Sequence, residues 1–264
     1  MHNGNSFITA GNLFLIIAVF TTSLYVWANL HSNKKAHLQK WPLRRLLFWL
    51  SGILCACVAL AGPLAAASHH DFRYHMAGHL LLGMLAPLLI ALSAPMTLLL
   101  RTLSTKNAKR CTHLLKSRLA GFYVNPVTAS ILNIGGLWLL YTTPLYNWMH
   151  MYPILYFLIH VHIFAAGYLF TISIIYIDPI SYRQSYTYRT IVFITALAVH
   201  GILSKYIYAH PPDGVIASQA QSGAMLMYYG GDLVDLILII LLFRDWYHSA
   251  RPRKQAEKAC LSPE

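Results

Sequence analysis

The sequence predicts an all-α integral membrane bundle of seven transmembrane helices. Apolar and aromatic residues make up 57% of its 264 residues and charged residues only 11%, whereas soluble domains carry about 25% charged residues. The apolar residues also form uncharged runs of about 20 residues, the length that an α-helix needs to cross a bilayer. One membrane domain over residues 1–248 is therefore expected, followed by a basic cytoplasmic tail at 249–264.

Seven of these runs follow one another along the chain, with short connections between them. They cover residues 7–28, 46–67, 75–100, 127–146, 152–177, 190–208 and 223–243. The fourth is the least hydrophobic because Asn133, Gly135 and Gly136 interrupt it, but leucine and tryptophan fill much of the remainder. Residues 1–6 contain no Lys or Arg, and the first run is too long for a signal-peptide core. This helix is therefore expected to stay in the mature protein.

The connections differ in charge, and the difference predicts the orientation. Of the 20 Lys and Arg residues, all but Arg73 and Lys205 fall in the segments that follow the first, third, fifth and seventh runs. Because cytoplasmic loops carry the excess of Lys and Arg, the N-terminus is expected outside and the C-terminus in the cytoplasm. This bias accounts for most of the net charge of +12. Basic residues divided among juxtamembrane segments favour contact with anionic lipid over nucleic acid.

Histidine is the enriched chemical group, with 14 residues against eight acidic ones. His75 and His79 are one helical turn apart at the start of the third run, so they share a helix face where the membrane meets water. The same outer region holds the methionines Met76, Met149, Met151, Met225 and Met227. Imidazole with thioether suits cuprous copper, which predicts an outward-facing His/Met copper site. In the alternative interpretation, the histidines anchor to head groups and the methionines pack.

Two histidines alone do not complete a metal site, and the sequence leaves the third ligand open. The candidates are His162, His150, Met151 and Met225. His160 and His162 face opposite sides of their helix, so at most one of them joins a common centre. We expect His162 to be that residue.

A carboxylate inside a membrane span is costly unless it is paired, and the seventh run contains Asp232 and Asp235. Asp232 lies 12 residues before Arg244 and His200 lies 11 residues after Arg189. At about 1.5 Å per residue, both are then about 16–18 Å from the cytoplasmic end. A contact between His200 and Asp232 is predicted, with Lys205 or His162 as the alternative partner.

At these residues the chain resembles a known family. The segment His75-Met-Ala-Gly-His79-Leu-Leu-Leu, with Ala86-Pro87 and Ala94-Pro95-Met-Thr-Leu-Leu-Leu-Arg101, resembles the signature span of CtaG-type assembly factors of caa-type cytochrome c oxidase. The similarity continues to three later spans: His162-Ile-Phe-Ala-Ala-Gly167-Tyr-Leu-Phe170, Ala198-Val-His200-Gly, and Gln219 to Gly223 with Gly230-Gly231. It covers about residues 73–243.

The resemblance implies a multi-pass protein of the bacterial plasma membrane that assists assembly of the oxidase and delivery of copper to its catalytic subunit. It also implies oxidase subunits and an extracytoplasmic copper chaperone as partners, and His75, His79, His162 and His200 as functional residues. The chain departs from the family pattern at three places: Ser218 for an acidic residue, Met227 or Tyr228 for a tryptophan, and Thr171 for a tryptophan. Methionine at such a position favours softer ligation, so Met225 and Met227 join the expected copper ligands.

Two other classes of protein remain open. A membrane b-type cytochrome would use span histidines such as His79, His162 and His200 as haem ligands. A metal or proton transporter would line its path with Asp232, Asp235 and the histidines. No catalytic motif such as Gly-x-Ser-x-Gly, a phosphate loop or His-Glu-x-x-His is present in the sequence, so an enzyme is not expected.

Overall fold

The computed structural model describes residues 2–36 and 38–250, and side chains from residue 11 onward. Within these residues the chain is helical and contains no strand. The α-helices are α1 (His2–Asn33), α2 (Leu43–Leu60), α3 (Pro63–Ser68), α4 (Phe72–Leu80), α5 (Ala86–Leu92), α6 (Pro95–Thr102), α7 (Thr105–Leu115), α8 (Arg118–Tyr123), α9 (Pro126–Ser130), α10 (Gly136–Thr142), α11 (Leu145–Met151), α12 (Pro153–Ile174), α13 (Tyr186–Ala209) and α14 (Ala217–Ala250). Two π-helical turns, η1 (Leu81–Leu85) and η2 (Ile131–Gly135), join α4 to α5 and α9 to α10.

Six described helices are long and apolar enough to cross a membrane. They are Gly11–Asn33, Leu43–Leu60, Phe72–Leu92, Pro153–Ile174, Tyr186–Ala209 and Ala217–Ala250. The expected fourth run, 127–146, is not among them because its helix ends at Thr142, where Thr143 is extended and Pro144 follows. A residue before proline is disfavoured in the helical conformation, which explains this early end. The expected third run also divides, since α5 ends before Ala94 and Pro95 begins α6.

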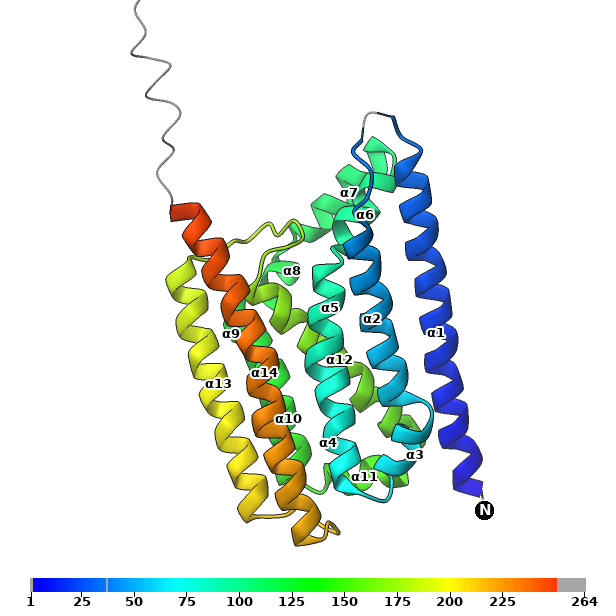
Figure 1. The fold of residues 1–264 in the computed structure, drawn as a ribbon, viewed down its shortest axis with the longest axis vertical. Helices are drawn as coiled ribbons and strands as arrows, with labels where there is room; N and C mark the ends of the chain where they lie inside the picture. Colours follow the sequence, from blue (N-terminus) through cyan, green and yellow to red (C-terminus); the bar gives the residue numbers. More distant parts are fainter. Residues whose placement is uncertain (1, 37, 251–264) are drawn as a thin grey trace, which may run out of the picture.

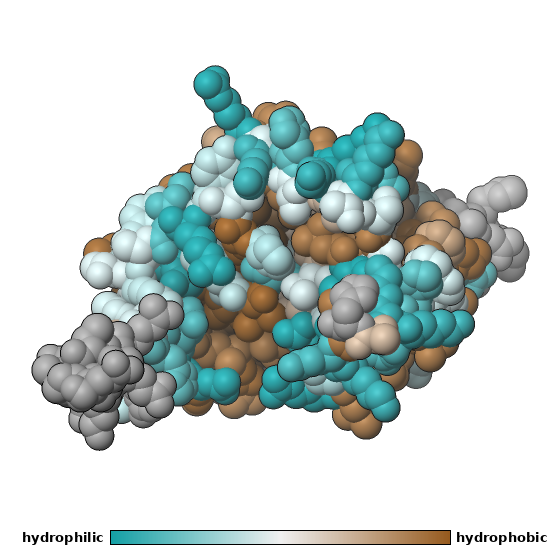
Figure 2. Space-filling model, turned by 90° about the horizontal axis from the view of Figure 1, so that it is seen from above, coloured by the Kyte–Doolittle hydropathy of each residue, from teal (hydrophilic) through white to brown (hydrophobic). Residues whose placement is uncertain are grey.

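The long helices run side by side between two ends of the molecule (Figure 1). The N-terminal end of α1 lies at one end with α3 and α11, whereas the last turn of α14 lies at the other end with α6 and α7. We refer to these as the outer end and the basic end, respectively. Hydrophilic residues cover much of the basic end, and hydrophobic side chains show between them (Figure 2). Many leucines and isoleucines stay exposed on the long helices, as expected for surfaces that face lipid.

The buried core of the described residues has an outer part, an inner part, and a smaller third cluster that contains Tyr25, Trp41 and Leu98. The outer part contains Phe72, Met76, Tyr141 and Met227, and the inner part contains Leu88, Phe170, Phe193, Val234 and Leu238. Since α4 packs closely with α14, and η1 and α5 pack with α12, the third span lies between two neighbouring helices. This central position buries the helix face that carries His75 and His79.

Polar groups at the basic end tie its segments together. The buried carboxylate of Asp178 accepts hydrogen bonds from the backbone N–H groups of Met96 and Thr97, at 3.0 and 2.7 Å, and from the Thr97 hydroxyl at 2.6 Å. It thereby caps the first turn of α6, which has no cap from Ala94, a residue in the left-handed conformation with φ 52°. A capping carboxylate also interacts favourably with the helix dipole. The loop after α12 therefore fixes the start of α6.

Candidate functional site: a buried histidine cluster

Four histidines from three spans are buried in the outer half of the bundle. These are His75, His79, His160 and His200, each less than a tenth exposed. His75 and His79 lie on one face of α4 because residues four apart in an α-helix are neighbours. His160 comes from α12 and His200 from α13. Burial of four imidazoles in so apolar a chain requires partners for their nitrogen atoms.

Close approach of two helices forms one wall of this cluster. A Cβ atom added to Gly167 in α12 would collide with the carbonyl oxygen of Gly83 in η1. A Cβ atom added to Gly83 would in turn lie 3.3 Å from the His79 ring and 3.0 Å from Ile163. Small residues allow such backbone approach between membrane helices. The two glycines therefore hold α12 against the turn that follows His79.

The innermost pair of imidazoles has nitrogen atoms without hydrogen-bond partners. Among the described residues, neither ring nitrogen of His79 has one, nor does Nε2 of His200. The two ring centroids are 6.5 Å apart. Leaving a buried polar atom unpartnered costs about 1–3 kcal/mol, so the arrangement carries a penalty that a bound ligand would remove.

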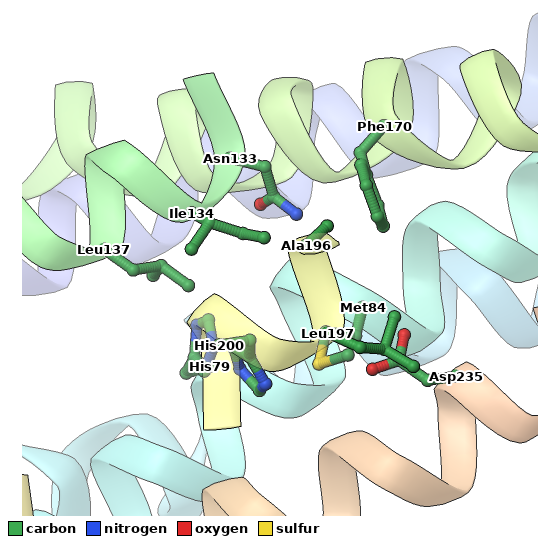
Figure 3. A pocket seen from close by; sticks show the side chains of 10 residues that line it. All are labelled: His79, Met84, Asn133, Ile134, Leu137, Phe170, Ala196, Leu197, His200 and Asp235. Atoms are coloured by element: carbon green, nitrogen blue, oxygen red, sulfur yellow. The ribbon is translucent and has the colours of Figure 1, made fainter. Parts of the chain in front are cut away.

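A small cavity adjoins these two rings (Figure 3). Its volume is about 20 Å³, and Met84, Asn133 and Asp235 contribute polar or sulfur-containing side chains to its lining. Space of this size holds about one water molecule or one ion. The His200 ring and the methyl group of Met84 both lie against Gly231, where an added Cβ would be 2.8 Å from the ring and 3.7 Å from the methyl. Two imidazoles, one thioether and one carboxylate thus border a space for a single ion.

Further imidazoles connect this pair to the outer end. His75 Nε2 and the Tyr141 hydroxyl share a 3.0 Å hydrogen bond, and the Tyr141 ring also lies 6.5 Å from His79. His150 in α11 lies 6.1 Å from His75 by ring centroids, and its Nδ1 is 3.4 Å from Nδ1 of His69. A line of aromatic nitrogen and oxygen groups therefore runs from the outer end into the bundle.

The outer members of this line are held neutral. Burial, and then the repulsion that the protonated forms of His150 and His69 would exert on each other, lower the pKa of His150 to about 4. Burial also lowers the pKa of His69 below its ordinary value, and the neighbouring His70 lowers it further. A neutral imidazole keeps a lone pair, and metals bind the neutral form. These two histidines can therefore accept a metal ion near pH 7.

The structure does not bring His162 to this cluster. Its exposed ring makes a 3.1 Å hydrogen bond to the carbonyl oxygen of Leu132, which lies in η2. It packs against Gly136, where a Cβ would be 2.7 Å from its Nε2. His160, the residue of this pair that we did not expect to take part, is the buried one. Its Nδ1 lies 2.7 Å from the carbonyl oxygen of Tyr156.

The expected methionines are also placed differently. Met225 is half exposed and lines an outer surface pocket with Lys205 and Tyr228. Met227 is fully buried in the outer part of the core. Met84, which the sequence analysis did not select, borders the cavity instead. It follows His79 by five residues, and a π-helical turn, with its i to i+5 repeat, brings such residues closer to one face than an α-helix does.

The predicted contact between His200 and Asp232 is corrected by the structure. Asp232 is exposed, and Asp235 lines the cavity beside His200. Equal depth along two helices does not ensure contact, because the rotation of each helix decides which side chains meet. The buried face of α14 carries Gly231, Val234, Asp235 and Leu238, and Asp232 lies off this face. The alternative partner, Lys205, lies over the ring of Tyr228 at 5.6 Å.

No group of three or more His, Cys, Asp or Glu side chains is arranged to hold a metal ion within residues 2–36 and 38–250. A metal site in this part of the chain would therefore need the thioether of Met84 or a ligand from outside the chain. Cuprous copper accepts such soft ligands, whereas metals that need several carboxylates fit poorly here.

Comparison with known proteins adds independent information. Residues 23–249 match the family described as cytochrome c oxidase caa3 assembly factor (Caa3_CtaG). An uncharacterized protein of Mycobacterium bovis is 33% identical over 173 residues, which cover 61% of this chain and 25% of that protein. An uncharacterized protein of Mycobacterium leprae is 28% identical over 233 residues, or 78% of this chain and 34% of that protein. The chain thus spans a quarter to a third of the length of these relatives. No solved structure matches it.

Proposed function

Since the chain belongs to the cytochrome c oxidase caa3 assembly factor family, we propose that it assists assembly by binding a cuprous ion and passing it to an oxidase subunit in the same membrane. Family membership implies a non-catalytic role in building the oxidase. Copper is cargo in this proposal, and the histidine cluster is the place where it is held.

One observation carries the proposal: the unpartnered ring nitrogens of His79 and His200 adjoin a cavity of about 20 Å³ that Met84 also lines. Two imidazoles and a thioether form a ligand set that suits cuprous copper. A buried site with few ligands also favours transfer, because an incoming ligand can replace one that leaves. The neutral state of His69 and His150 supports capture at the outer end, followed by ligand exchange inward through His75.

The proposed orientation has seven membrane crossings, with the N-terminus outside and the C-terminus in the cytoplasm of a bacterial cell. The start of α1 and the last turn of α14 lie at opposite ends of the bundle (Figure 1), which supports an odd number of crossings. In our proposal the segment Pro126–Thr142 is the seventh crossing. In this orientation His69 and His150 face an extracytoplasmic copper chaperone. Labelling of Ser117→Cys from the cytoplasm only, and of Asn147→Cys from outside only, is the expected result.

The direct test is copper stoichiometry of detergent-purified protein after anaerobic loading with cuprous ion. We expect about one copper per chain in the wild type, loss of it in the double variant His79→Ala/His200→Ala, and retention in His162→Ala. The His162 variant is the matched control because it removes an exposed imidazole outside the cluster. No specific copper in the wild type, or equal loss in the control, would contradict the proposal.

Two further measurements separate the other classes of protein. A Soret band in the purified protein would favour a membrane cytochrome over a copper carrier. Flux of copper or protons into vesicles would favour a transporter, whereas transfer to an oxidase subunit without flux fits the assembly role.

A further inference from the structure

A buried arginine at the basic end has no anionic partner among residues 2–36 and 38–250. Arg189, in the first turn of α13, is only 1% exposed. One of its terminal nitrogens donates a 2.6 Å hydrogen bond to the carbonyl oxygen of Ile174, at the C-terminal end of α12. Its guanidinium group also lies over the rings of Tyr176 and Tyr186, at 4.0 and 4.5 Å. These contacts fix the side chain in place without neutralising its charge.

The Nε donor of Arg189 is the feature that indicates a bound anion. Among the described residues, no carboxylate lies within ion-pair distance of this arginine, and its Nε has no hydrogen-bond partner. The nearby carboxylate of Asp245 accepts a 2.9 Å hydrogen bond from the Tyr186 hydroxyl instead. Because a buried cation is costly unless it is paired, an external anion would stabilise this arrangement.

The structure provides room for such an anion. Arg189 lines a pocket of about 160 Å³ at the basic end, together with Arg244, Asp245 and His248 from the last turns of α14. The same pocket also has an apolar wall, which includes Ile177, Leu241 and Leu242. Two arginines against the single carboxylate of Asp245 leave the polar wall with a net positive charge. A positive wall beside an apolar one matches a molecule that carries a phosphate next to a hydrocarbon chain. Basic pockets between helices at the cytoplasmic side bind lipid head groups of this kind.

We propose that the pocket between Arg189, Arg244 and His248 binds the phosphate of an anionic phospholipid from the cytoplasmic leaflet. The apolar wall favours a lipid over free phosphate, since inorganic phosphate has no hydrocarbon to place against Leu241 and Leu242. The site lies at the end of the molecule opposite the histidine cluster, so this proposal stands independently of copper binding.

Native mass spectrometry of the full-length protein, released from micelles that contain phosphatidylglycerol or phosphatidylcholine, tests the proposal. We expect the wild type to retain phosphatidylglycerol in preference to phosphatidylcholine. Arg244→Gln should weaken apparent affinity for phosphatidylglycerol by about fivefold, the effect of one basic residue near a head group. Arg244 is exposed, so this variant should fold even if Arg189→Gln does not.

Arg110→Gln is the matched control because it removes an exposed arginine from α7 at the same end, outside the pocket. It should leave the lipid preference unchanged. Equal retention of the two lipids by the wild type, or equal losses in Arg244→Gln and Arg110→Gln, would overturn the proposal. Displacement of phosphatidylglycerol by millimolar inorganic phosphate would overturn the assignment to lipid and indicate a site for the free anion.

Discussion

The outer histidine cluster and the α5–α6 junction at the basic end differ in whether their buried polar groups have hydrogen-bond partners. At that junction, the Asp178 carboxylate accepts from three donors, and the Tyr25 hydroxyl joins Trp41 to the carbonyl oxygen of Ser93. In the outer cluster, His79 and His200 have ring nitrogens without a hydrogen-bond partner in the part of the chain that the structure describes. Satisfied networks rigidify a fold, whereas unpartnered groups cost stability and call for an explanation. The comparison supports a structural role for the junction and agrees with the binding role that we propose for the cluster.

The largest effect is expected from a substitution that separates two helices of the histidine cluster. Gly167→Ala places a methyl group against the carbonyl oxygen of Gly83, so α12 must move away from η1. We expect the free energy of unfolding in mixed micelles to fall by about 3 kcal/mol, the upper part of the range for overpacking, with loss of copper binding. Gly135→Ala is the control, because its nearest neighbour is 3.8 Å from the added Cβ. Equal stability of the two variants would show that the close approach is unimportant.

Asp178→Ala tests whether the junction at the basic end is purely structural. Loss of the α6 cap and of the Thr97 hydrogen bond should reduce the free energy of unfolding by about 2–3 kcal/mol. Copper affinity of the folded protein should stay unchanged. Asp213→Ala, which alters an exposed carboxylate, should change neither quantity. A loss of copper affinity in the folded Asp178 variant would mean that the two regions are coupled.

The pH dependence of the free energy of unfolding tests whether His150, near the outer end, is buried in its neutral form. Burial and His69 lower the pKa of His150 to about 4 in the folded protein, whereas an unfolded histidine titrates near 6.5. Between these values the unfolded chain binds more protons, so stability falls as the pH drops from about 6.5 to about 4 and levels off below. With partial solvent screening, His150 contributes about 2 kcal/mol to this loss.

His150→Gln should therefore flatten the dependence of the unfolding free energy on pH across that window. His70→Gln is the control, since His70 is exposed. If the wild type and His150→Gln lose stability in parallel as the pH falls, the imidazole of His150 is not the group that titrates.

The smallest effect is expected from substitutions of the two aspartates in α14, Asp232 and Asp235, on copper affinity. Asp235 lines the cavity beside His200, but Asp232 is exposed. Asp235→Asn should lower copper affinity by about tenfold, as observed when a group that orients metal ligands is lost, and Asp232→Asn should leave it unchanged. Competition with a cuprous chelator measures both. The reverse order would restore the contact between His200 and Asp232 that the sequence predicts.

Patterns of hydropathy predicted much of the fold, because span length and helical character follow from composition alone. The all-helical character is confirmed for the described residues, with six helices long and apolar enough to cross a membrane where seven were expected. The family resemblance is confirmed over residues 23–249. The end of the fourth run was set by Thr143 and Pro144, a local effect that average hydropathy does not detect. Likewise Ala94 and Pro95 divide a run that contains no charge.

The candidate site was less predictable because it depends on rotation and tertiary packing. The i, i+4 spacing placed His75 and His79 on one face, as the structure has them. The choice between His160 and His162 required knowledge of which face of α12 meets α4. Met84 depends on a π-helical turn, and the pairing of His69 with His150 depends on how α11 folds back. Neither the position of Met84 nor the pairing of His69 with His150 can be predicted from the spacing of residues along the sequence.

The hydrogen bond between His75 and Tyr141 has a kinetic consequence for the copper transfer that we propose. In either tautomer of His75, this bond occupies Nε2, so the nitrogen cannot bind an ion until the phenol swings away. Removal of the hydroxyl in Tyr141→Phe would lower that barrier without changing the ligands at either end. If the proposed copper route is used, this hydrogen bond would slow the return of the ion toward the outer end and would also slow its transfer inward.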